Sequence, residues 1–141
     1  MILLDTNVFA AIMHIDREPV VARWLDRYAA NEFFVPTLVV FEIEYGIGCA
    51  PRGRYRRLLE QQRDDVMTKF IAGRIAIFDR GAAEHAAAVY ALRKNRERGE
   101  RIIDMQIAGL GIALDAPIAT RNTKDFDGLG AKIINPWAAG S

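Results

Sequence analysis

The sequence predicts an α/β protein built on a parallel sheet. Short apolar runs alternate along the chain with segments whose apolar residues recur at helical spacing. The first apolar run, Ile2–Leu4, is followed at once by the polar residues Asp5, Thr6 and Asn7. Strands that alternate with helices are typical of parallel sheets with helical crossovers. We therefore expect a single domain over residues 1–141, with strands and helices in alternation.

The composition excludes several classes of protein. Of the 141 residues, 51% are hydrophobic and 26% are charged, which is normal for a soluble globular domain. Cys49 is the only cysteine, so a disulfide framework or a thiolate metal site is excluded. The amino terminus lacks a signal-peptide pattern, and the longest apolar run, 102–114, is too short for a membrane span and carries Asp104. We expect a cytoplasmic protein with no membrane partner.

Turn residues and helical periodicity divide the first half of the chain. Pro19 suits the first position of a helix, and Pro36 closes an apolar strand. Gly46 and Gly48 are expected to end the helix that follows this strand. The expected elements are a short helix from residue 8 to 13, a helix from 19 to 28, a strand at 33–35, a helix at 37–45 and a helix at 54–71 with Tyr55 and Leu58 facing inward.

The second half repeats the alternation. Asp79 is expected to cap an alanine-rich helix that runs to about Arg96, and Gly99 is expected to break the chain. The expected elements are a strand at 75–78, this capped helix, a helix at 102–114, a strand at 117–119, a polar loop at 120–130 with one helical turn, and a last strand at 132–134.

Asp5 is the first residue that the fold class singles out. Because it directly follows the first strand, its carboxylate is expected at the carboxyl edge of the sheet, where open parallel sheets bind ligands. Asp is also a preferred N-cap residue, so Asp5 could serve only as the cap of the next helix. The stretch around Asp5 leaves both roles open.

Glu42 lies on a helix face where an apolar residue is expected. Leu38, Phe41 and Tyr45 form the apolar stripe of helix 37–45, and Glu42 occupies the i+4 position of that stripe. Glu44 points elsewhere and is expected to be an ordinary solvated residue. Glu42 is therefore the anomalous acid of this helix.

Asp104 is the single charged residue of the apolar helix at 102–114. A buried carboxylate is costly unless it is protonated, paired or bound to a metal. The alternative is that Asp104 only stabilises the amino terminus of its helix, where negative charge is favourable. When Asp104 is considered together with Asp5 and Glu42, the interpretation as a site residue is favoured over a role at the helix amino terminus alone.

Asn122 and Asp125 follow the strand at 117–119, as Asp5 follows the first strand. They could enter the same crevice as Asp5, or they could belong to a solvated loop with an Asx turn. Several acids and amides in one crevice suit a hard divalent cation such as Mg²⁺. Such an ion polarises a phosphodiester and lowers the pKa of an attacking water.

Taken together, these motifs resemble those of PIN-domain ribonucleases, and in particular the FitB-like branch of VapC-type toxins from bacterial toxin–antitoxin pairs. The resemblance covers essentially the whole chain and depends on the order and spacing of the motifs. The segments that carry it are Leu3-Leu4-Asp5-Thr6-Asn7, Phe41-Glu42-Ile43-Glu44-Tyr45-Gly46, Asp104-Met105-Gln106-Ile107-Ala108, the segment from Ala119 to Phe126, and Ile134-Asn135-Pro136-Trp137.

The resemblance implies a three-layer α/β/α fold and cleavage of RNA that depends on Mg²⁺ or Mn²⁺. Asp5, Glu42 and Asp104 correspond to the three acids of the family, with Asp5 and Asp104 as metal ligands. Asn122 stands at a fourth position, where many relatives have aspartate; it offers a carbonyl oxygen but no charge, and Asp125 could compensate in part.

The resemblance also implies protein partners. Relatives bind a cognate antitoxin whose carboxyl-terminal segment covers the active site, and they usually form homodimers, for which the helices around Trp24 and Leu58 are candidate surfaces. In the same resemblance, Thr6 and Asn7 are expected to orient Asp5 or the substrate.

Two basic runs are candidates for binding phosphate or partner. The first, Arg52 to Arg57, could face the antitoxin. The second, Arg93 to Arg101, directly precedes Asp104 and is for this reason the better candidate for binding RNA. Glu97 and Glu100 interrupt this run, so it could equally be a solvated helix end.

Two other functions remain open at this point. The absence of charge at Asn122 is compatible with a PIN-like module that binds RNA or a protein partner without efficient catalysis. An acid after a first strand also occurs in phosphoryl-transfer enzymes with an aspartate nucleophile, but these have a second aspartate where this chain has Asn7.

Overall fold

The computed structural model describes residues 1–93 and 101–138. In this part of the chain, five strands form one sheet in the order β3-β2-β1-β4-β5, and every pair of neighbours is parallel. The prediction of an α/β fold with a central parallel sheet is therefore confirmed. The strands are β1 (Ile2–Leu4), β2 (Phe33–Pro36), β3 (Ile75–Ala76), β4 (Ile118–Ala119) and β5 (Ile133–Ile134).

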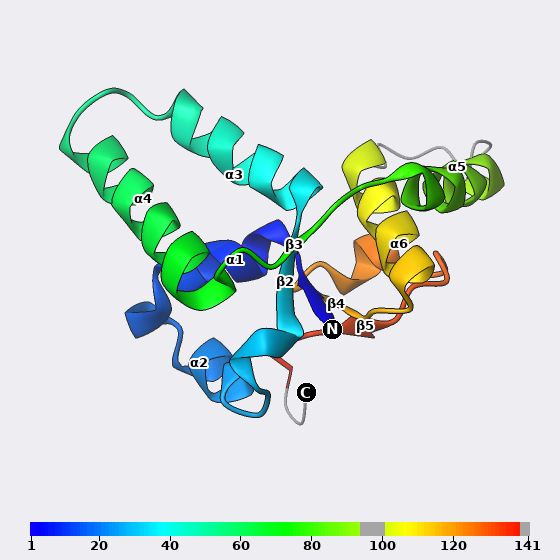
Figure 1. Ribbon diagram of the computed structural model, residues 1–141, viewed down its shortest axis with the longest axis horizontal. Helices are drawn as coiled ribbons and strands as arrows, with labels where there is room; N and C mark the ends of the chain where they lie inside the picture. The colour runs from blue at the N-terminus through cyan, green and yellow to red at the C-terminus, as the bar shows by residue number, and fades with distance from the viewer. Residues whose placement is uncertain (94–100, 139–141) are drawn as a thin grey trace.

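Helices cover both faces of this sheet, which gives the three layers that the family resemblance implies (Figure 1). α1, α2 and α4 lie on one side, and α5 and α6 lie on the other. The helices are α1 (Thr6–Met13), α2 (Pro19–Leu25), α3 (Thr37–Cys49), α4 (Arg54–Asp65), α5 (Arg80–Arg93) and α6 (Ile102–Leu114). No helix among the described residues is long and apolar enough to cross a membrane.

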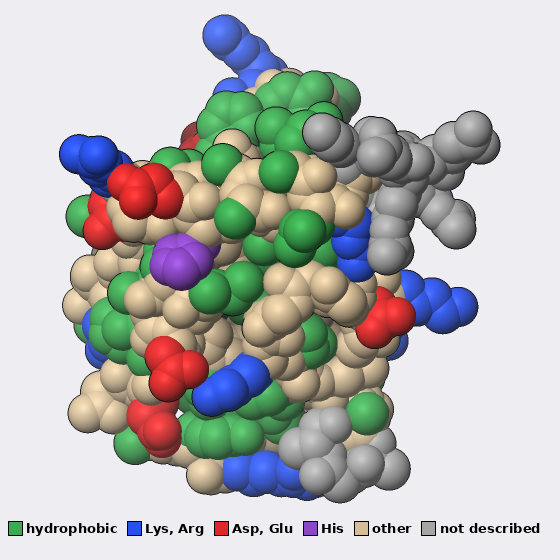
Figure 2. All heavy atoms as spheres, turned by 90° about the vertical axis from the view of Figure 1, so that its right-hand side faces the viewer, with side chains coloured by type: hydrophobic (Ala, Val, Ile, Leu, Met, Phe, Trp, Pro, Cys, Tyr) green, Lys and Arg blue, Asp and Glu red, His purple; other side chains and the backbone are tan. Residues whose placement is uncertain are grey.

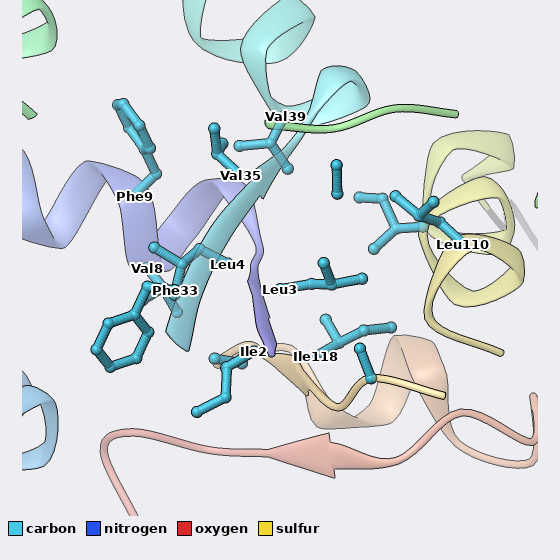
Figure 3. Packing of buried hydrophobic residues seen from close by; sticks show 14 of the residues in the cluster. Ile2, Leu3, Leu4, Val8, Phe9, Phe33, Val35, Val39, Leu110 and Ile118 are labelled. Carbon is cyan, nitrogen blue, oxygen red and sulfur yellow. The ribbon is translucent and has the colours of Figure 1, made fainter. Parts of the chain in front are cut away.

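β1 lies at the centre of the core. All three of its residues are buried, because the strand is covered on both faces. Successive side chains of a strand point to opposite faces. Figure 3 shows Leu3 on the side of Leu110 from α6, and Leu4 on the side of Val8 from α1. This strand therefore delivers its next residue to the edge of a sheet that both helical layers hold in place.

The carboxyl end of α3 differs from the prediction. We expected the helix to end near Gly46 and Gly48, but it continues through both glycines to Cys49. A glycine in a helix interior costs about 1 kcal/mol relative to alanine. Burial of Ile47 in this last turn contributes about 1.5–3 kcal/mol, which is comparable to the combined cost of the two glycines.

The buried face of α3 also differs from the prediction. Val39, Ile43 and Ile47 face the core, whereas Phe41 and Tyr45 are 64% and 67% exposed. The two exposed rings stack on each other with their centroids 6.3 Å apart. The helix is apolar on most of its circumference, so periodicity alone selects the wrong stripe.

The helix predicted at 54–71 is two segments, because α4 ends at Asp65 and a π-helical segment continues over Val66–Ile71. Tyr55 and Leu58 are exposed, contrary to the prediction that they face inward. Trp24 of α2 is buried in the core and is not itself available to a partner, although Val20 of the same helix is exposed.

The remaining elements occur where they were predicted, although α2 ends at Leu25 and not at residue 28. Asp79 accepts a hydrogen bond of 3.0 Å from the backbone N–H of Ala82 and so caps α5. The strand at 75–78 is shorter than expected, and Arg96 and Gly99 lie outside the described residues. A single 3-10 turn, Thr123–Phe126, occupies the loop after β4, as expected.

Candidate active site

Asp5 leaves the end of β1 as a buried carboxylate, with 4% of its surface exposed. Its Oδ1 atom accepts a hydrogen bond of 2.8 Å from the backbone N–H of Thr6, so Asp5 is the N-cap of α1. Its Oδ2 atom accepts hydrogen bonds from Thr120 Oγ1 at 2.7 Å and from Asn7 Nδ2 at 3.2 Å. Asp5 therefore caps a helix and also stands at the carboxyl edge of the sheet.

Thr120, the first residue after β4, joins the ends of two neighbouring strands. It is completely buried, and its hydroxyl group accepts hydrogen bonds from Asn7 Nδ2 and the backbone N–H of Asn122 while it donates to Asp5. Asn7 Oδ1 in turn accepts from the backbone N–H of Arg121. This network fixes the orientation of the Asp5 carboxylate. Sequence reasoning missed Thr120; the available signal was a β-branched hydroxyl residue directly after a buried strand.

Glu42 lies beside this network, at the border of the buried face of α3. Its Oε1 atom accepts a hydrogen bond of 2.6 Å from Thr6 Oγ1, and its Oε2 atom accepts one from Arg101 Nη2. Only 17% of its side chain is exposed. Glu44, by contrast, is exposed and pairs with Arg63, as expected for a solvated residue.

Asp104 lies in the first turn of α6 and is 5% exposed. The N-cap of this helix is Arg101, and no side-chain hydrogen bond caps it. No side chain or backbone group in residues 1–93 and 101–138 donates a hydrogen bond to the Asp104 carboxylate. Capping therefore does not account for this acid, although the helix dipole favours its charge.

The acids influence one another electrostatically. Burial raises the pKa of Asp104 to about 6; Arg101 opposes this shift, whereas the charges of Asp5, Asp125 and Glu42 add to it. Burial also raises the pKa of Asp5, against the hydrogen bonds from Thr120 and Thr6, and Glu42 adds to the rise. Asp5, Glu42 and Asp104 are therefore close enough for their negative charges to repel one another.

The loop after β4 contributes less than the sequence suggested. Asn122 is exposed, and its side chain makes no hydrogen bond with the described part of the chain. Asp125 is also exposed, yet it is near enough to Asp104 to raise the pKa of that residue. The roles of both residues remain predictions.

The oxygen donors of this site are of the chemical type that a hard divalent cation prefers. Asp5, Glu42 and Asp104 offer carboxylate oxygens, and Asp104 is a buried anion without a hydrogen-bond donor among the described residues. In residues 1–93 and 101–138, no group of three His, Cys, Asp or Glu side chains is arranged to hold a metal ion. Both oxygens of Glu42 are already bound, by Thr6 and Arg101.

The basic runs differ in their relation to the site. Arg52, Arg56 and Arg57 line a pocket with Glu60 at the turn between α3 and α4, away from the start of α3 (Figure 1). On the side of α5 and α6, basic and acidic side chains are interspersed (Figure 2). Of the second run, the structure describes only Arg93 and Arg101, and Arg101 reaches the site.

Fold and site together define a parallel α/β domain with buried carboxylates at the carboxyl edge of its sheet. Residues 2–132 match the family described as PIN domain. Because this match spans most of the chain, the protein belongs to the PIN-domain family, as its motifs indicate.

Individual relatives match over nearly the full length. The VapC ribonuclease Y4jK of Sinorhizobium fredii is 29% identical over 137 residues, which are 97% of this chain and 98% of the relative. Toxin FitB of Neisseria gonorrhoeae is 27% identical and covers 97% of this chain and 99% of its own length. The structure of FitAB bound to the IR36 DNA fragment contains a chain with a TM-score of 0.84 and 26% identity, covering 100% of this chain and 99% of that one.

Proposed function

We propose that this protein is the ribonuclease toxin of a toxin–antitoxin pair and hydrolyses phosphodiester bonds of RNA. The observation that carries the proposal is the convergence of Asp5, Glu42 and Asp104 at the carboxyl edge of the sheet, two of them buried. Relatives named VapC ribonuclease and Toxin FitB match almost the whole chain and support the same activity.

We further propose that catalysis depends on Mg²⁺ or Mn²⁺, with Asp5 and Asp104 as the residues that hold the ion. A divalent cation, when bound, polarises the phosphodiester and lowers the pKa of the attacking water. Thr120 and Asn7 hold the Asp5 carboxylate in one orientation, so little reorganisation of this ligand is needed. Burial of Asp104 strengthens its interaction with a cation.

Glu42 and Asn122 complete the proposed site. In this proposal Glu42 accepts a proton from the attacking water or binds the cation through water; the influence of its charge on Asp5 and Asp104 supports this role. Asn122 supplies an amide oxygen for orientation of water, without charge. Asp125 supplies a negative charge from the same loop.

The decisive experiment is cleavage of RNA by the purified protein with Mg²⁺ or Mn²⁺. Asp5→Asn and Asp104→Asn are expected to abolish cleavage, and Glu42→Gln is expected to lower it by about 100-fold, a typical contribution of general acid–base catalysis. Glu44→Gln is the matched control on the same helix and should cleave like the wild type. Activity that survives EDTA or both aspartate variants contradicts the mechanism.

A second candidate function is a module that binds RNA or a protein partner with weakened catalysis. The exposed, neutral side chain of Asn122 favours it, because the fourth position of the site then carries no charge. Calorimetry separates the two functions. Binding of RNA without any binding of Mg²⁺ or Mn²⁺ supports the module, and coupled binding of metal and RNA supports the nuclease.

We propose a cognate antitoxin as the protein partner. The structural neighbours include chains from FitAB and from VapBC complexes bound to DNA, and one further neighbour belongs to the VapBC family of toxin–antitoxin systems. Co-expression with the product of a small neighbouring gene, followed by affinity purification, tests this partner. Loss of RNA cleavage in the co-purified complex is the expected result. Such a protein would act in the cytoplasm.

We also propose a homodimer. Exposed apolar side chains gather on the hairpin formed by α3 and α4: Phe41, Tyr45, Tyr55 and Leu58. Leu58→Ser should lower the molar mass measured by light scattering toward that of the monomer. Leu92→Ser, at an exposed position of α5, is the control that should leave the mass unchanged.

A further inference from the structure

Within residues 1–93 and 101–138, Arg101 is the one cation that lies against the acids of the site. It stands at the N-cap of α6, three residues before Asp104, and its Nη2 atom donates a hydrogen bond to Glu42 Oε2 on α3. The two partners are 59 residues apart in the sequence. The Arg101 side chain is 52% exposed, so its guanidinium group can move into solvent.

The charge of Arg101 acts on all three acids. Partial burial lowers its pKa, but the attraction of Asp104, Glu42 and Asp5 outweighs burial and raises the pKa overall. In return, Arg101 opposes the rise in the pKa of Asp104 and of Asp5. One guanidinium group therefore partly neutralises three carboxylates that would otherwise repel one another.

We infer that Arg101 is an internal counter-ion that competes with the divalent cation for Glu42, so that Glu42 turns to the cation only after Arg101 has left it. The inference rests on the metal site of the proposed function. With Thr6 on Oε1 and Arg101 on Oε2, both oxygens of Glu42 are bound, and no three acids are arranged to hold a metal in the described part of the chain.

If Arg101 competes with the cation, removal of its charge should raise the affinity for the cation and lower the melting temperature of the metal-free protein. A unit charge and a divalent cation about 6 Å apart in a water-like dielectric interact by an amount equivalent to about a tenfold change in affinity. Removal of the Arg101 charge should therefore tighten Mn²⁺ binding by about tenfold. The same change leaves the acids unneutralised without metal, so the metal-free protein should melt at a lower temperature.

The experiment is calorimetric titration with Mn²⁺ of the full chain as wild type, Arg101→Gln and Arg101→Lys, together with melting temperatures in EDTA and in Mn²⁺. Arg101→Gln should bind Mn²⁺ more tightly and gain more melting temperature from it than the wild type does. Arg101→Lys, which keeps the charge, should remain close to the wild type. Arg63→Gln breaks the other arginine–glutamate pair of α3, with Glu44, and should leave Mn²⁺ affinity unchanged.

Unchanged or weaker Mn²⁺ binding by Arg101→Gln overturns the inference, and so does equal tightening by Arg63→Gln. If the glutamine variant is poorly folded, a lysine variant that binds Mn²⁺ much more tightly than the wild type also overturns it. Absence of Mn²⁺ binding in every variant overturns it as well. Because these readouts need no RNA, a protein that fails to cleave RNA but shows the expected shift in affinity contradicts the proposed function alone.

Discussion

Thr120 Oγ1 lies 2.7 Å from Asp5 Oδ2, and this buried hydrogen bond joins residues 115 positions apart in the chain. The parallel pairing of β1 with β4 aligns Leu4 with Ala119, so the residue that follows each strand reaches the same edge. The backbone N–H of Asp5 also donates to the carbonyl oxygen of Ala119 at 3.0 Å. The sheet register therefore sets the orientation of the central acid of the site.

Replacement of Thr120 by valine tests this relationship. The shape of the side chain is kept, but Asp5 loses a donor in a buried position. A hydrogen bond to a charged group contributes about 1.5–3 kcal/mol, so the free energy of unfolding should fall by about that amount. RNA cleavage should fall as well, because Asp5 loses its orientation. Urea unfolding and cleavage rates provide the two measurements.

Thr123→Val is the control for this variant, because Thr123 is exposed in the loop after β4. It should change the free energy of unfolding by less than about 0.5 kcal/mol. If Thr120→Val is as stable as Thr123→Val, the hydrogen bond to Asp5 contributes no net stability.

Gly109 on α6 tests how closely the helix that carries Asp104 must pack on α5. A Cβ atom at Gly109 would lie 2.4 Å from the backbone nitrogen of Ala86, a distance that requires the two helices to separate. Gly109→Ala should therefore destabilise the protein by about 1–3 kcal/mol, the usual cost of overpacking. Thermal unfolding checks this value.

Gly46→Ala is the matched control in a helix with free space. No atom lies within 4 Å of a Cβ atom at Gly46, so alanine should stabilise the protein by about 0.5–1 kcal/mol through backbone entropy. Equal effects at Gly46 and Gly109 would show that helix propensity, rather than contact between α5 and α6, sets the result.

The sequence predicted those features of the site that depend on near neighbours in the chain. Asp5 follows a strand and precedes a helix, and both facts can be read locally. Glu42 was predicted from an apolar stripe through Phe41 and Tyr45 that turned out to be exposed, so its place at the site border did not follow from the stated reason. What holds Glu42 is Thr6 and Arg101, residues 36 and 59 positions away.

Thr120 and Arg101 show why the other contacts of the site could not be predicted from the sequence. Their partners are set by strand order and by the approach of α6 to α3, and periodicity along one element carries no information about either. Asp104 was the exception, because a single charged residue on an apolar helix can be recognised from the sequence of that helix alone. Its burial followed from its own helix, whereas its electrostatic neighbours did not.

Asn122→Asp tests whether the missing charge of the fourth position limits metal binding. The influence of Asp125 on Asp104 indicates that a charge in this loop acts on the site. An added carboxylate at Asn122 should therefore tighten Mn²⁺ binding by about two- to fivefold, which is a modest Coulombic gain for an exposed group. Calorimetry measures it, with Lys132→Gln as a control that should show no change, because Lys132 directly precedes β5 and pairs with the exposed Asp115. Equal affinities would place Asn122 outside the metal site.

The pH dependence of stability tests the burial of Asp104. Its pKa is raised from 3.8 to about 6 in the folded protein, so between these pH values the folded state binds more protons than the unfolded state. In EDTA, the contribution of Asp104 to the free energy of unfolding should therefore decrease as pH rises from about 4 to about 6, and level off above. Asp104→Asn should lack this decrease and exceed the wild type in stability at pH 7. Urea unfolding at each pH measures both, and Asp115→Asn, at an exposed position, should follow the wild type. A less stable Asp104→Asn at pH 7 would mean that attraction to Arg101 outweighs the cost of burying the carboxylate.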